Sequence, residues 1–344
     1  MKKIFTLIAA AFITLSVNAQ EVWSVSTIDL STNVTSAPNT TATLKKVPTI
    51  YNLEGGAQPT EEQVKADATA TLELSDYTFT GSTTNVTLTA VSTPNTGTAT
   101  GDIWKFSGQD NVKLNKTNLG DECIVEFDNQ FMWAGNGNPT LASYEYYFTN
   151  SNGDEVGPRY YDTPWEPGCN NVPLKGVYYK FNSKTDGTLT VGFYLHKNLK
   201  DNNLYIVNGT TKALIDKDGI TIKGFRQNCN YEVEKGSPTK LGTYTLNENY
   251  FVQNEIMGTD TNRPLHGYVS WAVAANTDYY MFSPRSQMGL YGFQFTAGGS
   301  SGVETIKVEK VWNADAPMYN LSGQKVDKSY KGIVIQNGRK FVNK

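Results

Sequence analysis

Apolar and polar residues alternate at every second position over many short stretches of this chain. From Asp121 onward the alternation recurs at close spacing, for example at Val177 to Phe181, Leu189 to Leu195, Tyr268 to Val273 and Leu290 to Phe295. Period two is typical of a strand with one buried face. Asn-Gly and Asp-Gly pairs stand between the runs, and they tolerate the positive φ angles of tight hairpins. The pattern predicts many short antiparallel strands.

Residues 23 to 114 are less clearly patterned. Strands are expected near Thr69 to Leu74, Tyr77 to Phe79, Val86 to Ala90 and Ile103 to Phe106. One short helix is predicted after Pro59, where Thr60 and Gln63 have the spacing of a capping box. Further along, the alternation in Cys123 to Phe127 predicts a strand that buries Cys123.

The predicted fold class is all-β, with an antiparallel β-sandwich or jelly-roll body and a short C-terminal β-hairpin module. The composition agrees, because 20 Tyr and 15 Phe among 344 residues favour pleated sheet over helix. Short strands with frequent turns are typical of sandwiches and jelly rolls. No repeat of 20 to 50 residues is visible, which disfavours a solenoid or a propeller.

The N-terminus has the three parts of a secretory signal peptide. A basic start at Lys2 and Lys3 precedes an apolar run from Ile4 to Val17, and Val17-Asn18-Ala19 is a small-x-small cleavage pattern. We therefore expect residues 1–19 to be removed and the protein to be exported. No later segment approaches the roughly 20 apolar residues of a transmembrane helix, so no transmembrane segment is predicted.

Charge and flexibility divide the rest of the chain. Residues 298–302 read Gly-Gly-Ser-Ser-Gly, which is a linker composition, between a body at residues 20–297 and a tail at 303–344. The tail carries eight Lys and Arg against four Asp and Glu, a net +4. Subtracting the tail and the two signal lysines from the total of -3 leaves -9 for residues 20–302. An acidic body argues against a nucleic-acid partner, and the basic tail suggests a module with a separate role.

The tail contains two sequence blocks of a specific kind. Tyr319-Asn-Leu-Ser-Gly-Gln-Lys-Val326 is followed by Tyr330-Lys-Gly-Ile-Val-Ile335 and by Asn337-Gly-Arg-Lys-Phe341. These blocks resemble the C-terminal sorting tails of Bacteroidetes type IX secretion substrates, over about the last 30 residues. The resemblance implies that outer-membrane secretion machinery reads the tail and that the protein is placed at the cell surface or outside the cell.

Within the tail, five residues match this pattern: Tyr319, Leu321, Gly323, Gly332 and Lys340. The two glycines are expected to shape turns, while the lysine belongs to the basic end. The alternative is an ordinary terminal hairpin closed by Asn337-Gly338 that docks on the body.

The body resembles, more loosely, β-sandwich modules of secreted Bacteroidetes polysaccharide-processing proteins. The resemblance rests on Gly176 to Phe181, Asp186 to Val191, Tyr279 to Phe282 and Leu290 to Phe293. It implies a jelly roll, but shared architecture does not fix function.

Three cysteines in an exported chain allow one disulfide and one free thiol. Cys169 and Cys229 both lie in loop-like segments and are the candidate pair. No CxxC motif is present, and no second thiol lies near a histidine, so neither a zinc site nor a thiol enzyme is expected.

Signatures of catalysis are weak. His196 ends an alternating run and His266 is expected in a loop, and the chain has neither a Gly-x-Ser-x-Gly elbow nor a P-loop. A sandwich glucanase would need a second glutamate where Phe131 stands. No catalytic residue, metal ligand or cofactor is assigned, although distant carboxylates that converge in the fold leave a hydrolase or lyase as an alternative.

The segment Asp216-Lys217-Asp218-Gly219 resembles the start of a calcium-binding loop. The twelfth position is Gln227 in place of the bidentate glutamate, so a turn is the preferred interpretation. A structural calcium ion elsewhere stays an open alternative.

The candidate binding residues are aromatic. Trp133 lies in a Gly- and Asn-rich segment, and Arg159, Tyr160, Tyr161 and Trp165 lie in a second segment that reads as a loop. Exposed aromatic rings in loops stack on sugar rings while polar neighbours bind the hydroxyls. The alternative is that these aromatics are core residues at the ends of the sandwich.

Non-catalytic binding of an extracellular glycan is therefore the leading hypothesis for this sequence. An adhesin or structural surface protein that binds other proteins is the second hypothesis, and a polysaccharide hydrolase or lyase is the third.

Overall fold

A computed structural model describes residues 20–67, 70–93, 104–107, 114–127, 130–134, 139–196, 203–226, 240–253, 264–284, 287–298, 318–320, 324–327, 329–336 and 339–343. The chain divides into two compact units, Met1–Gly299 and Ser300–Lys344. The division falls inside the Gly- and Ser-rich segment at residues 298–302. The predicted signal segment lies outside the described residues.

In the first unit, two large sheets face each other. Among the described residues one sheet has nine strands. Its order is β14 (Val252–Gln253), β13 (Gly242–Leu246), β12 (Thr221–Arg226), β15 (Leu265–Val273), β10 (Gly187–Leu195), β17 (Met288–Ala297), β6 (Phe131–Trp133) and β5 (Lys105–Ser107), with β1 (Gln20–Ser24) also on β17.

The second sheet has eight strands within the described ranges. Its order is β11 (Tyr205–Asn208), β16 (Thr277–Phe282), β9 (Val177–Ser183), β4 (Val86–Ser92), β3 (Ala70–Ser82), β2 (Thr35–Asn52), β7 (Thr140–Thr149) and β8 (Glu155–Pro164). All pairings are antiparallel in this sheet except that of β2 with β7.

Between the two sheets lies the main core. Phe181 of the eight-stranded sheet packs edge-on against Trp271 and Phe293 of the nine-stranded sheet, with ring centroids 5.9 and 5.8 Å apart. Trp104 and Trp271 are buried in this core. These contacts confirm an all-β sandwich, since side chains from two inner faces form one core. The jelly-roll connectivity stays a prediction.

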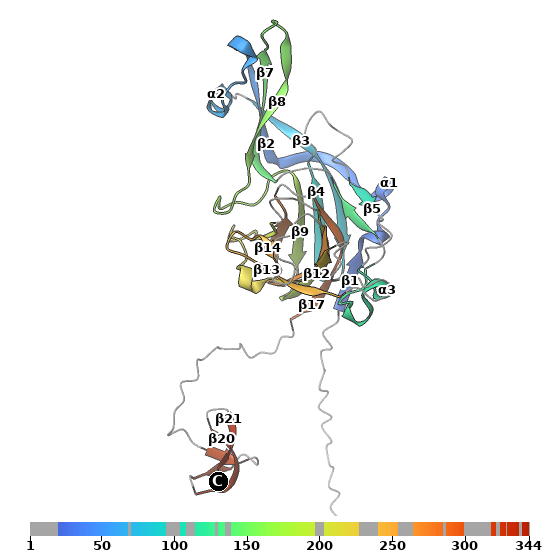
Figure 1. The fold of residues 1–344 in the computed structure, drawn as a ribbon, viewed down its shortest axis with the longest axis vertical. Coiled ribbons are helices and arrows are strands. Elements are labelled where there is room, and N and C mark those ends of the chain that lie inside the picture. Colours follow the sequence, from blue (N-terminus) through green and yellow to red (C-terminus); the bar gives the residue numbers. More distant parts are fainter. Residues whose placement is uncertain are drawn as a thin grey trace, which may run out of the picture. The chain divides into compact units, whose positions relative to one another are not determined.

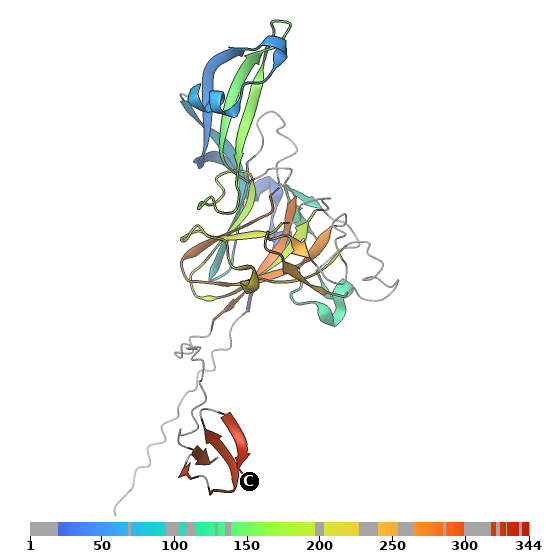
Figure 2. The same ribbon diagram turned by 60° about the vertical axis from the view of Figure 1, so that its left-hand side comes forward.

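One end of the eight-stranded sheet continues beyond the sandwich as an arm, which we define as residues 50–67 and 140–164 (Figures 1 and 2). The start of β2 pairs with β3, whereas Ile50, Tyr51 and Asn52 at its end pair in parallel with Tyr147, Phe148 and Thr149 of β7. The hairpin of β7 and β8 forms the other side of the arm. β8 is the last strand of the sheet order, and a bulge at Gly157 and Pro158 interrupts it, as is common on edge strands.

A short helix, α2 (Glu61–Asp67), covers one face of the arm and buries Val64 against Tyr144, Tyr146 and Phe148. Its start has the predicted capping box. The Thr60 N–H donates to Gln63 Oε1 at 2.7 Å, and the Gln63 N–H donates to Thr60 Oγ1 at 3.3 Å. The other described helices are one turn long: α1 (Leu30–Asn33), α3 (Lys116–Leu119) and the 3-10 helices η1 (Val25–Thr27), η2 (Glu54–Gly56), η3 (Gly120–Glu122) and η4 (Lys217–Gly219).

Several local predictions were wrong. Residues 123–127 form no strand, because the Phe127 N–H donates to the Leu114 carbonyl and Val125 accepts from the Tyr268 hydroxyl instead of a strand partner. Asp186-Gly187 closes no hairpin, because β9 and β10 on either side of it belong to different sheets. The pair instead connects one layer of the sandwich to the other.

The second unit is a small antiparallel sheet in the order β19 (Lys325–Val326), β18 (Met318–Asn320), β20 (Gly332–Gln336) and β21 (Arg339–Asn343). Met318 and Val334 are buried in it. Gln336 pairs with Arg339, so the predicted hairpin forms around Asn337-Gly338, which themselves lie outside the described residues. No helix in the described part of the chain has the length and apolar character to cross a membrane.

Candidate functional site

The five aromatic and basic residues selected from the sequence do not form one site. Trp133 lies in β6 of the nine-stranded sheet, while Arg159, Tyr160 and Tyr161 lie in β8 of the other sheet. Trp165 follows β8 directly. The second segment, which reads as a loop in the sequence, is therefore strand up to Pro164, and its strand is interrupted by the bulge at Gly157 and Pro158.

Trp165 is a core residue with 4% of its surface exposed. Its ring packs against Tyr205 and Phe282 at centroid distances of 5.1 and 4.8 Å, and its Nε1–H donates to the Asn171 carbonyl at 2.8 Å. Burial leaves no ring face for a sugar, which removes Trp165 from the candidate site.

Tyr161 also points into the structure. Its ring stacks on Tyr146 at 5.2 Å beneath α2, and its hydroxyl donates to the Pro59 carbonyl. Arg159 is exposed on the same strand, whereas the side chain of Tyr160 lies outside the described ones. Trp133 is half-buried, and Lys105 Nζ lies 4.0 Å from its ring centroid, a cation–π contact that occupies one face of the ring.

The cysteines give no reactive centre among the described residues. Cys123 is half-buried beside the Tyr268 hydroxyl, and burial raises the pKa of its thiol. The Sγ of Cys169 lies 3.7 Å from the Asn171 carbonyl. Because Cys229 lies outside the described residues, its pairing with Cys169 stays a prediction.

His266 differs from the expected loop residue. It lies in β15, which begins directly after Pro264, and it is fully buried among Phe131, Tyr194 and Phe225. Its Nδ1 is 2.8 Å from the Tyr291 hydroxyl. Burial lowers the pKa of His266 to about 3, so the ring is neutral and out of reach of any substrate.

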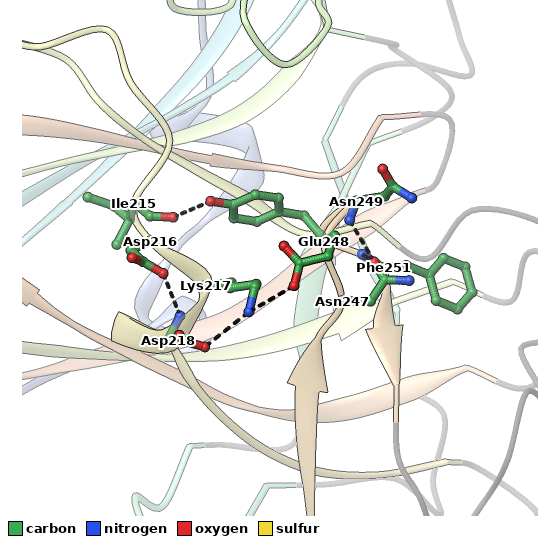
Figure 3. Close-up of polar contacts among 9 residues, drawn as sticks. Ile215, Asp216, Lys217, Asp218, Asn247, Glu248, Asn249 and Phe251 are labelled. Atoms are coloured by element: carbon green, nitrogen blue, oxygen red, sulfur yellow. Dashed lines mark hydrogen bonds and ion pairs between the residues drawn. The ribbon is translucent and has the colours of Figure 1, made fainter.

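Residues 216–219, which resemble the start of a calcium-binding loop, form a turn that is stabilised by hydrogen bonds and ion pairs (Figure 3). Asp216 Oδ1 accepts from the Asp218 N–H at 3.0 Å, and Lys217 Nζ lies 3.2 Å from Asp218 and 3.3 Å from Glu248. A neighbouring turn is closed by Asn247 Oδ1 in the same way. Lys217 thus supplies the positive charge between these carboxylates. Across the described residues no three His, Cys, Asp or Glu side chains gather as metal ligands.

The candidate binding site lies at the tip of the arm. A hollow of about 560 Å³ opens there between the end of β2, the turn η2 and the hairpin between β7 and β8. Its lining residues are Asn52, Leu53, Gly55, Thr149, Asn150, Ser151 and Gly153. Most are neutral and polar, so they present amide, hydroxyl and main-chain groups to a ligand.

Local hydrogen bonds hold this hollow open. Thr149 Oγ1 donates to Asn52 Oδ1 at 2.9 Å and ties β7 to β2. Asn150 Oδ1 accepts from the N–H groups of Asn152 and Asp154 at 2.9 and 3.0 Å, which fixes the hairpin. Gly153 and Gly55 have φ of 86° and 69°, values that favour glycine. The site is therefore built before a ligand arrives.

The sequence alone did not point to this hollow. Asn150 to Glu155 read only as a hairpin turn, and Asn52 and Thr149 are ordinary polar residues in their own segments. The parallel pairing of β2 with β7 brings them together over about 100 residues of sequence, and no local pattern reports such a pairing.

In the tail unit the sorting-type residues are described in part. Tyr319 is exposed in β18, Gly332 begins β20 and Lys340 lies in β21 opposite Ile335. Leu321 and Gly323 lie outside the described residues. Gly332 has a φ of 138°, which fits its predicted place at a bend.

Comparison with protein families, with curated proteins and with solved structures finds no match to this chain.

Proposed function

We propose that this protein is an exported, non-catalytic binding protein for an extracellular glycan, and that the hollow at the arm tip is its binding site. The volume and lining of the hollow carry this proposal. About 560 Å³ falls within the range of small-molecule sites. Amides and hydroxyls both donate and accept hydrogen bonds, which suits sugar hydroxyls.

A protein-binding adhesin is the second candidate, and one observation favours it. Ile50 on the arm is 43% exposed, and a large exposed apolar side chain suits a protein partner. The neutral polar lining next to it favours a glycan.

Affinity electrophoresis in gels that contain soluble starch, xyloglucan, galactomannan or desialylated mucin tests the proposal. We expect retardation by at least one polymer, and Asn52→Leu should weaken binding about tenfold because it removes the amide from the hollow. Thr149→Val should act in the same direction. The matched control is Thr245→Val, an exposed strand threonine of the other sheet, which should bind like the wild type.

No retardation by any of these polymers would refute the proposal. Binding to host or neighbouring-cell proteins that resists Asn52→Leu would support the adhesin. Release of reducing ends or of unsaturated products would show an enzyme.

We also propose that the tail directs the protein to the cell surface through outer-membrane secretion machinery, after removal of the signal segment. The tail blocks around Tyr319 and Gly332 support this proposal, together with the change of charge from -9 to +4 at the linker.

A further inference from the structure

The arm sheet has one covered and one open face. Tyr144, Tyr146, Phe148 and Tyr161 lie on the face beneath α2. Because alternate strand residues point to opposite faces, Glu145, Tyr147 and Thr149 point away from α2. No described helix packs on their side: Ile50 there is exposed and Tyr147 is only half-buried.

The strand register joins this open face to the hollow. In the parallel pairing Ile50 lies beside Tyr147 and Asn52 lies beside Thr149. The 2.9 Å hydrogen bond between Thr149 and Asn52 places both side chains on the same side. Tyr147 is two residues from Thr149, so its ring lies about 7 Å along the strand from the polar lining.

The Tyr147 ring packs against Gly157 of β8. A Cβ atom at Gly157 would lie 2.5 Å from Cδ1 of Tyr147, closer than any real side chain allows. The Tyr147 ring therefore lies across the bare backbone of the β8 bulge. The ring contacts Gly157, which is itself exposed, and Tyr147 is half-buried.

Two carboxylates flank the ring. The Tyr147 hydroxyl is 3.4 Å from Glu145 Oε1, and Glu155 is also close enough to act on the phenol. Burial and these two charges raise the pKa of Tyr147, so the ring stays neutral. Carboxylates accept hydrogen bonds from sugar hydroxyls and repel sugars that carry acid groups.

We propose that Tyr147, seated on Gly157, is an aromatic platform on which a neutral pyranose ring of the glycan stacks, next to the unit held in the hollow. The inference rests on the proposed glycan-binding function and names the ligand class: an uncharged chain of at least two sugar units. A sugar ring has an apolar C–H face that fits an aromatic ring, and its edge hydroxyls reach the exposed Glu155, whereas Glu145 is buried behind the phenol.

Three variants at position 147 test the platform with the neutral polymer that gives the strongest retardation and with its oligosaccharides, by isothermal calorimetry. Tyr147→Ala should weaken binding at least tenfold. Tyr147→Phe should stay within about threefold of the wild type because the ring remains, while Tyr147→Leu, which keeps the apolar cover of Gly157, should bind as weakly as Tyr147→Ala.

Gly157→Ala gives a second test that leaves Tyr147 in place. The new methyl must push the ring aside, and the φ of 157° at Gly157 disfavours a side chain, so we expect weaker binding together with a lower unfolding temperature. Gly168→Ala is its matched control, because Gly168 also has a positive φ, of 88°, and a Cβ there meets nothing within 4 Å; it should lower the unfolding temperature without weakening binding.

Charge provides a readout that a purely structural role would not change. Polygalacturonate and alginate should not retard the wild type, and Glu155→Gln should increase binding of these anionic polymers relative to the neutral one.

The outcomes separate the inference from the proposed function. If Asn52→Leu loses binding while Tyr147→Ala binds like the wild type, the hollow stands and the platform is refuted. Preference for the anionic polymers in the wild type also refutes it. If no polymer binds, both ideas fail together.

Discussion

His266 is a titratable group enclosed by aromatic rings. Phe225 lies nearly parallel to it at 5.7 Å, and Tyr291 supplies its hydrogen bond. Desolvation disfavours the charged imidazolium, so the fold holds the ring neutral. The position makes His266 a contributor to the pH dependence of stability.

We expect the free energy of unfolding to fall by about 1 kcal/mol between pH 7 and pH 5.5 because of His266. The unfolded chain takes up a proton below pH 6.5, whereas the folded chain does so only near pH 3, so stability is lost as the pH falls through this window. Urea unfolding at both pH values checks this. His266→Gln should flatten the dependence; an unchanged slope in His266→Gln would contradict the prediction.

For single residues, the sequence correctly predicted the features that depend only on nearby residues. Thr60 and Gln63 form their capping box because both partners lie within one turn of helix. Trp165 and His266 were misplaced because neighbouring Gly and Pro residues resemble a loop, while distant residues such as Phe282 and Tyr291 decide their burial.

Among the elements, α2 has little stability of its own. Seven residues are too few for an isolated helix, so it depends on its cap and on Val64 in the arm core. It is the element that keeps one face of the arm covered.

Thr60→Ala should therefore loosen α2 by about 1 kcal/mol, since it removes the side-chain acceptor of the Gln63 N–H. Hydrogen exchange should speed up at residues 61–67, with little change in the sandwich strands. Thr60→Ser keeps the hydroxyl and is the control. Equal acceleration in β10 and β15 would show that the helix does not open separately.

The sequence also predicted the positions of the strands better than it predicted which strands pair with each other. The sequence located β9, β10 and β15 correctly, although the structure buries most of their residues on both faces. Asp186-Gly187 resembles a hairpin turn but connects the two sheets, since a turn residue permits a reversal without choosing the partner strand. The hollow was missed for the same reason.

The whole molecule consists of two units with their own cores, a sandwich and a small sheet around Met318 and Val334. In the small sheet Tyr319 pairs with Ile335 and Ile333 pairs with Val342, so these four exposed apolar residues share one face. Exposed apolar faces of this kind are typical of surfaces that bind another protein.

Deletion of residues 303–344 should leave the unfolding temperature of the first unit within about 1 °C of the full chain, because each unit has its own core. In cells the truncated protein should stay in the periplasm, as shown by fractionation and surface proteolysis. Normal surface display of the truncation would refute the sorting role of the tail, and loss of folding would refute the independence of the units.

The parallel pairing of β2 with β7 also sets an order of assembly. Ile50 can pair only after Tyr147 has been synthesised, nearly 100 residues later. Synthesis of these residues takes about 5 to 20 s at typical rates. Until then the outer edge of β2 has no partner, whereas β3 can pair with β2 soon after it emerges. The ligand site of the arm thus exists only after the chain has closed this long loop.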